Sequence, residues 1–545
     1  MKISIVPRCR PDVIKQKIRQ AELLAHEISS EWPELDWRRD GFSDHVIREE
    51  IGDEPTLYLD DFSEIPIIGV EDNSSILQQR ARLRAGDGDW VAQTRMVEAG
   101  FSDYCEHLLE LGRVNWLYPA NEDSDPRKIA LACWQDQGLR HDLEQAVRQS
   151  GLRYIHPHIS TLHVWELADL LQKSTNRPIS VIGPTPAISK WANDKIEFSR
   201  TVSRLLGESI VPHSESAYNF AMLTKIISRL AATHPQLAIK FPYGTGGYGN
   251  FLVDTKIIRG LNLKQTRSYL VDLLDRHCWP ENGRVLVDVW ETDVIKSPSV
   301  QIWIPPLNYG DPVIEGVFEQ AFTGKKGQYV GARPADLPSD IQQQIVNDSY
   351  LLAYLYQNLG YVGRCSFDLI LVGERLSDCR IEFIECNARW SGTSIPMTLM
   401  NRLAVPEQNR TFSVRKIGIP DVWQLEFAEL IRAMDAELYR PRTGQGSFIF
   451  FNPARITEHS AVEAIAIADC IEKADRLLES HLPITLDSLV HPLGAESFQR
   501  PEHVSLDPSI SIKPTVSTKK SLPDEPSSPS QFLMDHADFD EAGRE

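Results

Sequence analysis

The sequence predicts an α/β protein that becomes α+β in its middle part, and three observations lead to this prediction. Of the 545 residues, 42% are hydrophobic and 24% are charged, which is close to the globular average and sufficient for cores of normal size. Between residues 112 and 190, short apolar runs alternate with helical patterns, as is typical of a parallel sheet. From residue 190 to 400, helix and strand signals stay dense and include a strand–turn–strand pattern.

The first 190 residues predict strands separated by helices. Apolar residues at helical spacing predict a helix at residues 14–29. The other elements expected here are strands at 3–6, 56–59, 114–118, 153–155 and 179–182, and helices at 141–150 and 161–173.

The chain beyond residue 190 alternates less regularly. We expect helices at 196–206, 217–232, 340–359, 423–438 and 460–480, and strands at 236–241, 251–254, 285–289, 300–304, 365–372, 380–385 and 447–451. The strands at 365–372 and 380–385 flank a polar turn, so a hairpin is expected there. The segment after Pro492 is rich in Pro and Ser and then acidic, which predicts a disordered tail at 491–545.

Charge and cysteine content exclude some classes of protein. The formal net charge of −19 argues against coating of nucleic acid or of an anionic membrane. The sequence has no apolar run long enough to span a bilayer and no signal-peptide pattern at its start. Its eight cysteines form no C-x-x-C pair, so we expect reduced thiols in a cytoplasmic protein. A zinc site at Cys365, Cys379 and Cys386 is disfavoured because the spacings suit no usual zinc motif.

A lysine followed by a glycine-rich loop is the strongest local motif. Lys240 ends a predicted strand, and Gly244, Gly246, Gly247 and Gly249 follow before the next strand. Glycines let backbone N–H groups converge on phosphate oxygens, and the lysine adds a positive charge. The loop lacks the Gly-Lys-Ser/Thr of a Walker A motif and the following helix of a Rossmann fingerprint. The simpler alternative is a hairpin with a glycine-rich turn.

The predicted hairpin carries a cluster of oxygen donors. Asp368 lies in its first strand, and Glu385, Asn387 and Arg389 lie at the end of the second. Strict alternation would place Glu385 on the same face as Phe383. Two carboxylates and an amide suit Mg²⁺, and the arginine beyond them suits a phosphate or a carboxylate. The alternative is an acidic strand end held by a surface salt bridge.

A third motif opens the helix at 196–206. It reads Asn193-Asp194-Lys195, in which Asn193 or Asp194 would cap the helix and Lys195 would extend from its first turn. Without the other motifs it would be read as a capped helix with an exposed lysine.

Taken in order along the chain, these motifs resemble the ATP-grasp superfamily. The match covers about residues 190–400. It consists of Asn193-Asp194-Lys195, Lys240 with the loop from Gly244 to Asn250, Phe367-Asp368, and Ile384-Glu385-Cys386-Asn387-Ala388-Arg389. An α/β domain in front of this part is usual for the family.

The resemblance implies a nucleotide site. Lys195 and Lys240 would contact the α- and β-phosphates of ATP, and Gly246, Gly247 and Gly249 would lie in a flexible lid over the β- and γ-phosphates. The strand at 285–293 would be the hinge that reads adenine and ribose. Its candidate acids, between which the sequence does not decide, are Asp288, Glu291 and Asp293.

The resemblance also implies a metal site. Asp368, Glu385 and Asn387 would bind one or two Mg²⁺ ions, with Mn²⁺ as an alternative, and Arg389 would stabilise the transferring phosphoryl group or the acyl phosphate. The family more often has Glu where Asp368 stands, so the metal spacing is expected to differ while the oxygen chemistry is retained.

A fainter resemblance concerns the flanking parts. Residues 152–195 and Phe450-Phe451-Asn452-Pro453 look like parts of peptide ligases from natural-product pathways. We therefore expect an N-terminal pre-ATP-grasp α/β domain at 1–189, a two-subdomain ATP-grasp fold at 190–400, a C-terminal α+β extension at 401–490, and the tail.

The function implied is an ATP-dependent carboxylate–amine ligase that acts through an acyl phosphate and takes small-molecule acid and amine substrates, with neither nucleic acid nor membrane as partner. The alternatives are a carboxylase, an acyl–thiol ligase or a non-catalytic ATP-binding regulator. Met1-Lys2 is the only Met-Lys in the chain, so a biotinyl group would have to come from another chain. The segment 391–394 is expected on the acceptor side, and a homodimer is left open.

Overall fold

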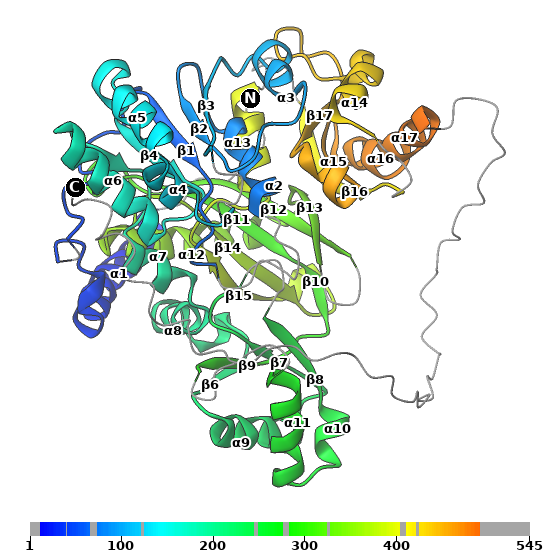
Figure 1. Ribbon diagram of the computed structural model, residues 1–545. Coiled ribbons are helices and arrows are strands. Elements are labelled where there is room, and N and C mark those ends of the chain that lie inside the picture. The colour runs from blue at the N-terminus through cyan, green and yellow to red at the C-terminus, as the bar shows by residue number, and fades with distance from the viewer. Residues whose placement is uncertain are drawn as a thin grey trace, which may run out of the picture. The chain divides into compact units, whose positions relative to one another are not determined.

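The computed structural model describes residues 11–39, 41–65, 74–120, 125–244, 249–275, 283–323, 328–403, 410–420 and 425–490 (Figure 1). The predicted strand at 3–6 and the predicted tail at 491–545 lie outside these residues. None of the described helices has the length and apolarity that a membrane span requires.

The N-terminal part contains a parallel sheet, as predicted. Its strand order is β3-β2-β1-β4-β5, and all four ladders are parallel. Leu57 and Leu59 of β1 are fully buried under the helices that follow β3 and β4. The elements are β1 (Thr56–Leu59), α2 (Ser74–Gln78), β2 (Trp90–Ala92), α3 (Phe101–Asp103), β3 (Asn115–Leu117), α4 (Ile129–Gln135), α5 (Gln137–Gln145), β4 (Tyr154–Pro157), α6 (Leu162–Thr175) and β5 (Ser180–Val181).

A small antiparallel sheet follows, in the order β6-β9-β7-β8. Its core consists of apolar residues of α9 and α11 packed on β7 and β9. The elements from the start of this part are α7 (Pro186–Asn193), α8 (Lys195–Leu206), β6 (Ser214–Ala217), α9 (Phe220–Ala231), β7 (Gln236–Lys240), β8 (Asn250–Asp254), α10 (Thr255–Arg259), α11 (Leu263–Asp275) and β9 (Val285–Val289). The helix predicted at 217–232 thus begins three residues late, because β6 extends to Ala217.

The largest sheet has nine strands, in the order β10-β14-β11-β12-β13-β16-β18-β17, with β15 paired to β14. Strands β16–β18 come from residues beyond 401, so the C-terminal part continues the same sheet. The elements are β10 (Val294–Lys296), β11 (Pro298–Ile304), β12 (Val313–Thr323), β13 (Gln328–Pro334), α12 (Ser339–Asn358), β14 (Gly363–Val372), β15 (Arg380–Asn387), α13 (Ser394–Leu403), β16 (Thr411–Gly418), α14 (Phe427–Ala433), β17 (Phe448–Phe451), α15 (Ala454–His459), β18 (Ala461–Ala468), α16 (Ile471–Arg476) and α17 (Leu482–Val490).

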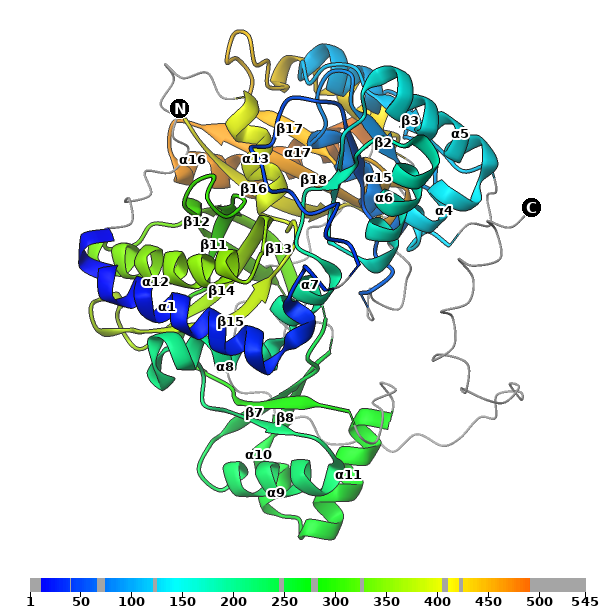
Figure 2. The ribbon, with the colours of Figure 1, turned by 90° about the vertical axis from the view of Figure 1, so that its left-hand side faces the viewer.

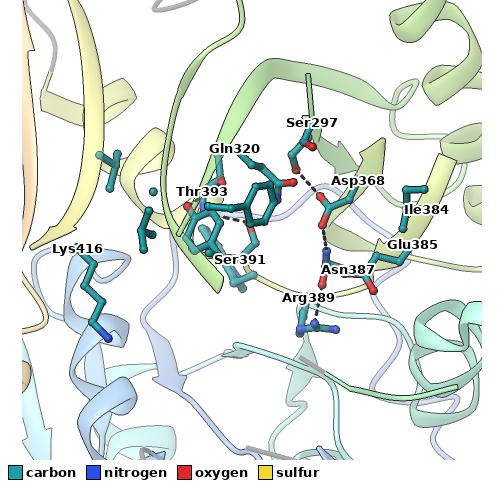
Figure 3. A pocket seen from close by; sticks show the side chains of 18 of the residues that line it. Ser297, Gln320, Asp368, Ile384, Glu385, Asn387, Arg389, Ser391, Thr393 and Lys416 are labelled. Atoms are coloured by element: carbon teal, nitrogen blue, oxygen red, sulfur yellow. Dashed lines mark hydrogen bonds between the residues drawn. The ribbon is translucent and has the colours of Figure 1, made fainter. Parts of the chain in front are cut away.

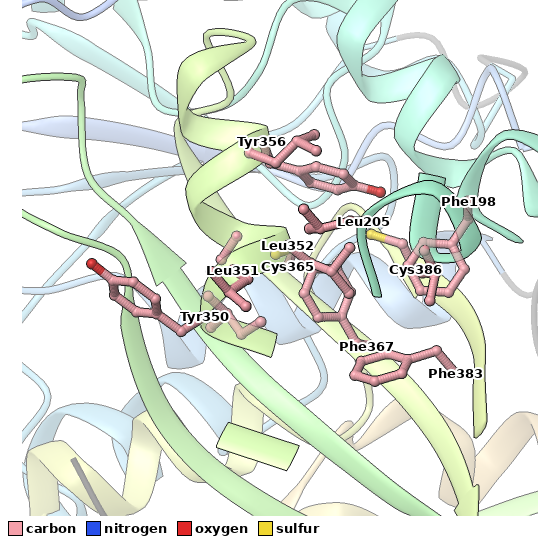
Figure 4. Close-up of a cluster of buried hydrophobic side chains, with 14 of the residues drawn as sticks. Phe198, Leu205, Tyr350, Leu351, Leu352, Tyr356, Cys365, Phe367, Phe383 and Cys386 are labelled. Atoms are coloured by element: carbon pink, nitrogen blue, oxygen red, sulfur yellow. The ribbon is translucent and has the colours of Figure 1, made fainter. Parts of the chain in front are cut away.

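The first helix, α1 (Pro11–Glu31), packs on α12 rather than on the parallel sheet (Figure 2). Its buried positions, Ala21, Leu24 and Ile28, belong to the same core as the inner faces of β14 and β15. Figure 4 shows Phe367 and Phe383 of this hairpin beneath Tyr356 of α12. This core fixes the strands that carry the predicted metal ligands.

A β-bulge in the hairpin corrects the predicted faces of β15. Asp368 pairs with Glu385, but Leu369 pairs with Phe383, so Ile384 is an extra residue. Phe383 therefore packs in the core, whereas Glu385 lines a cavity on the other face. The expectation that these two side chains share a face is wrong.

The helix predicted at 460–480 is also wrong over its first half. Residues Ala461–Ala468 form β18, which lies between β16 and β17 and is buried on both faces. A strand covered on both sides does not alternate between apolar and polar residues. The four alanines of β18 also favour a helix in sequence-based prediction. The helix predicted at 423–438 is shorter in the structure, where α14 covers Phe427–Ala433.

Candidate active site

A cavity of about 660 Å³ brings most of the predicted site residues together (Figure 3). It lies where the small antiparallel sheet meets the nine-stranded sheet, and residues from the parallel-sheet part close one side. The predicted residues that line it are Lys240, Asp288, Glu291, Asp368, Glu385, Asn387 and Arg389.

Two carboxylates lie side by side in this cavity. Asp368 and Glu385 are direct cross-strand partners in the β14–β15 ladder. Burial, and then the negative charge of Glu385, raises the pKa of Asp368 to about 6. Burial alone would also raise the pKa of Glu385, but the charge and hydrogen bond of Lys195, with the charges of Arg389 and Lys240, together outweigh it. The pKa of Glu385 therefore lies below its usual value.

Each of the two predicted lysines forms a buried ion pair. Lys195, the first residue of α8, places its Nζ 2.8 Å from Oε2 of Glu385. Lys240, the last residue of β7, places its Nζ 2.5 Å from Oδ2 of Asp288. Both lysines are at least 94% buried, at 5% and 6% relative exposure. Asp288 is buried as well, whereas the carboxylate of Glu385 is about a quarter exposed. Two buried ammonium groups paired with carboxylates at a cavity form a charge pattern that suits a polyphosphate.

Arg389 is held by two amides. Its Nη2 donates to Oδ1 of Asn387 at 2.6 Å, and its Nη1 donates to Oδ1 of Asn193. Nδ2 of Asn387 donates in turn to Oδ2 of Asp368 at 2.9 Å. These contacts form a chain of three side chains, Asp368–Asn387–Arg389, along the cavity wall.

The Asn193-Asp194-Lys195 motif divides its roles among its three residues. Asp194 is the helix cap, since its Oδ1 accepts from the backbone N–H of Ile196 at 2.8 Å. Its other oxygen pairs with Arg284. Asn193 instead orients Arg389, and Lys195 pairs with Glu385, so only one residue of the motif acts as a cap.

The three acids of the predicted hinge do not all lie at the cavity. Asp288 and Glu291 line the cavity, whereas Asp293 is exposed and is not among the lining residues. Glu291 pairs with Arg380 at 3.3 Å. Of the three candidate acids, Asp288 and Glu291 are therefore the two whose position allows contact with a ligand in the cavity.

The glycine-rich loop is described only at its ends. Gly246 and Gly247 lie outside the described residues, and Gly244 and Gly249 are not among the lining residues. Gly249 has φ +81°, and its carbonyl accepts from the N–H of Phe241 at 2.9 Å. A side chain at this position would be strained, and its Cβ would meet Phe241.

The oxygen atoms of Asp368, Glu385 and Asn387 are the candidate ligands for a divalent cation. Among the described residues no group of three His, Cys, Asp or Glu side chains is arranged to hold a metal ion. Asp368 and Glu385 supply two adjacent carboxylates. Burial, and then the charge of Glu385, raises the pKa of Asp368, so a bound cation would favour its charged form. Two carboxylates with an amide nearby fit Mg²⁺ when phosphate oxygens complete its coordination.

The lining includes Ser299, which had no signal in the sequence, and part of the segment 391–394, which was expected there. Ser299 of β11 donates to Oδ1 of Asp368 at 2.6 Å. Strand β11 is the direct neighbour of β14 in the sheet but lies about 70 residues away in the sequence. Ser391, Gly392 and Thr393 line the cavity where the acceptor side was expected. His158 lines it as well, and burial, followed by the charges of Arg80, Arg84 and Arg389, keeps the pKa of His158 well below its usual value.

The six described cysteines are free, and the cavity lining includes none of them. Cys365 and Cys386 are buried in the core behind the hairpin. That these thiols are reduced in the cell stays a prediction.

No protein-family model and no curated protein sequence matches this chain. Among solved structures, the biotin carboxylase domain of 2-oxoglutarate carboxylase from Hydrogenobacter thermophilus is 13% identical, with a TM-score of 0.47 over 80% of this chain and 93% of that chain. Biotin carboxylase from Campylobacter jejuni is 13% identical, with a TM-score of 0.49 over 80% and 91%. N5-carboxyaminoimidazole ribonucleotide synthetase from Thermus thermophilus is 13% identical, with a TM-score of 0.46 over 81% and 100%.

Each of these similarities extends over about four fifths of this chain. The Hydrogenobacter domain was solved with MgADP, ADP and bicarbonate. At identities this low, the function of the present chain has to rest on its own residues.

Proposed function

We propose that this chain is an ATP-dependent ligase that activates a carboxylate as an acyl phosphate and joins it to an amine, forming an amide or peptide bond. The observation that carries the proposal is the meeting, at one cavity, of the Lys240–Asp288 pair, the Lys195–Glu385 pair and the Asp368–Asn387–Arg389 chain. Their order along the chain is the one that the ATP-grasp resemblance requires.

The charges support a polyphosphate ligand. The backbone N–H of Lys195 donates to the carbonyl of Pro242, two residues after Lys240, and the charges of both lysines act on Glu385. Phosphate oxygens would replace carboxylates as the partners of both lysines. Mg²⁺ held by Asp368 and Glu385, with Asn387 beside them, would neutralise the negative charge of the phosphoryl oxygens. Asp288 and Glu291 are the acids that remain candidates for ribose contacts.

The reaction has two steps. A carboxylate oxygen of the acid attacks the γ-phosphorus of ATP, the bond to the bridging oxygen breaks, and ADP leaves with that electron pair. The amine nitrogen then attacks the acyl carbon, phosphate leaves, and the extra proton of the amine passes to solvent. Lys240 and Lys195 would position the phosphates, and Arg389 would hold the transferred group.

The test is release of ADP from Mg-ATP in the presence of pooled carboxylic acids, amino acids or short peptides, with hydroxylamine as the amine. We expect both ADP and a hydroxamate, because hydroxylamine captures an acyl phosphate. Glu385→Gln should lower turnover at least about a hundredfold, since it removes a metal ligand and the partner of Lys195. Glu374→Gln, in the exposed turn of the same hairpin, is the matched control and should keep full activity.

Other outcomes would point elsewhere. ADP release that depends on bicarbonate and gives no hydroxamate would favour a carboxylase, and release that depends on a thiol would favour an acyl–thiol ligase. Nucleotide binding without turnover in any pool would favour the regulator. If Mg-ATP does not bind to the folded chain, the proposal is wrong.

A further inference from the structure

The cavity has a second end at which cations outnumber acids. Arg80, Lys416, Arg455 and Glu463 line it, and we call these four residues the basic end. Figure 3 shows Lys416, on β16, set apart from the Asp368–Asn387–Arg389 chain. The charge of Arg455 acts on both Arg80 and Lys416, so the four groups are close to one another.

The single acid of the basic end is already paired. Glu463 is the cross-strand neighbour of Lys416 in the β16–β18 ladder, but its Oε1 pairs with Nε of Arg455. Within the described residues Lys416 forms no ion pair. Arg80 forms none there either, and the hydrogen bond that its guanidinium makes runs from Nε to the carbonyl of Leu77, at 3.2 Å.

The acids near the basic end form their ion pairs with other cations, although the charges of Asp60 and Glu463 act on Arg80 and favour its charged form. Asp60 is fully buried and pairs with Arg84. Arg415, which precedes Lys416 in β16, pairs with Asp475 and Glu479. The basic end therefore carries an excess of two positive charges. Burial, and then the charge of Arg455, lowers the pKa of Lys416, and the charge of Glu463 offsets this only in part.

The sheet sets the distance between the two ends. Strand β14, which carries Asp368, is separated from β16 by β11, β12 and β13. Four strand spacings correspond to about 19 Å along the sheet. The wall between the ends includes Phe322, Tyr329 and Val414, and Gly392 leaves room for the Tyr329 ring, which a Cβ there would contact at 2.8 Å.

We infer that the basic end binds a carboxylate or phosphate group at the far end of an elongated substrate whose other end reacts at Arg389. The middle of such a substrate would cross the partly apolar wall. The identity of the reacting end rests on the proposed function, but binding of the anionic group at Arg80, Lys416 and Arg455 does not.

Pyridoxal phosphate tests this inference without knowledge of the substrate. Its phosphate would bind to Arg80 and Arg455, its aldehyde would condense with Lys416 with loss of water, and borohydride would reduce the imine to a stable amine. We expect pyridoxal phosphate to label Lys416 at least about tenfold faster than pyridoxal, which lacks the phosphate, as read from peptide masses. Arg80→Gln should remove most of this preference, and Lys473→Gln, at an exposed lysine of α16, should leave it unchanged.

Competition distinguishes the two sources of the anion. Protection of Lys416 by glycerol phosphate points to a phosphate, and protection by glutarate points to a carboxylate. Labelling of Lys416 no faster than of exposed lysines, or no protection by either compound, would overturn the inference. Because Mg-ATP binding is measured separately, preferential labelling in a chain that does not bind Mg-ATP would contradict the proposed ligase and keep the anion site.

Discussion

Asp368 and Glu385 face each other across two antiparallel strands, and two like charges in this position lower stability. Lys195 compensates the charge of Glu385 at 2.8 Å, whereas Asp368 receives its hydrogen bonds from the neutral groups of Ser299 and Asn387. Burial, and then the charge of Glu385, raises the pKa of Asp368 to about 6, and these hydrogen bonds offset the rise only in part. Such a cost to stability is expected where two carboxylates are kept for a cation.

We expect Asp368→Asn to raise the free energy of unfolding of the metal-free protein at about pH 8, by at most about 3 kcal/mol. The folded pKa of about 6 lies above the usual 3.8, so the folded state favours the protonated carboxyl. Its contribution to stability is full below about pH 4 and is lost as the pH rises through 6. The gain should therefore vanish below about pH 4, as measured by urea unfolding.

Asp293→Asn is the control, because this carboxylate is exposed and lies outside the cavity lining. It should change the unfolding free energy by less than about 0.5 kcal/mol at either pH. A gain for Asp368→Asn that is the same at both pH values would show that relief of charge is not its cause. Mg²⁺ should stabilise the wild-type chain at the higher pH more than the Asp368→Asn variant.

At this scale the sequence predicted the chemical groups but not their partners. Lys195, Lys240 and Glu385 were identified from local motifs. The pairing of Lys195 with Glu385 joins α8 to β15, and the pairing of Lys240 with Asp288 joins two strands of the small sheet. Local spacing contains no information on such contacts, and for the same reason Arg80 and Lys416 were not recognised.

Among the elements, those with a strong local period were predicted best. The helices α1, α8 and α12 and the β14–β15 hairpin agree with the sequence to within a few residues. Strand β18 was missed because it is buried on both faces. The bulge at Ile384 was missed because an extra residue in a strand leaves no mark in its composition.

The bulge makes a prediction about two deletions in β15. Deletion of Ile384 would remove the extra residue and leave Glu385 and Cys386 on their present faces, so we expect a loss of about 1 kcal/mol or less in unfolding free energy. Deletion of Cys386 would turn Asn387 toward the core occupied by Phe383, so we expect a loss of more than about 3 kcal/mol. Urea unfolding followed by circular dichroism measures both variants.

The two deletions remove one residue each from the same edge strand, so each serves as the control for the other. Equal losses would mean that β15 can shift along β14 and that the bulge does not fix its register. Turnover in the Ile384 deletion would then report separately on how the bulge directs Glu385.

At the scale of the whole molecule, the proposed nucleotide site draws on three parts of the chain. Lys195 belongs to α8, Lys240 to the four-stranded sheet, and Asp368 to the nine-stranded sheet. A ligand held by all three should stabilise them together. The cavity that joins them could not be predicted from the sequence, because it depends on how the sheets meet rather than on any one segment.

We expect a non-hydrolysable ATP analogue with Mg²⁺ to stabilise the folded chain by about 2.7 kcal/mol at a hundred times its dissociation constant. In differential scanning calorimetry the unfolding transition should move to higher temperature by a few degrees. EDTA should remove most of the shift, and adenosine, which lacks phosphates, should cause little. An equal shift with adenosine, or with EDTA present, would mean that the lysines and carboxylates do not hold the phosphates.

The joining of β16 to β13 limits how this protein can be divided. Residues 410–490 supply three strands of the sheet that carries Asp368, so a shortened chain ending at Leu403 would leave β13 with a row of unpaired backbone groups. An exposed strand of this kind is a template for pairing with other chains, and such a fragment should self-associate. A fusion partner or a truncation should therefore be placed beyond Leu486, where the compact unit ends, and not at the end of the motifs that the chemistry requires.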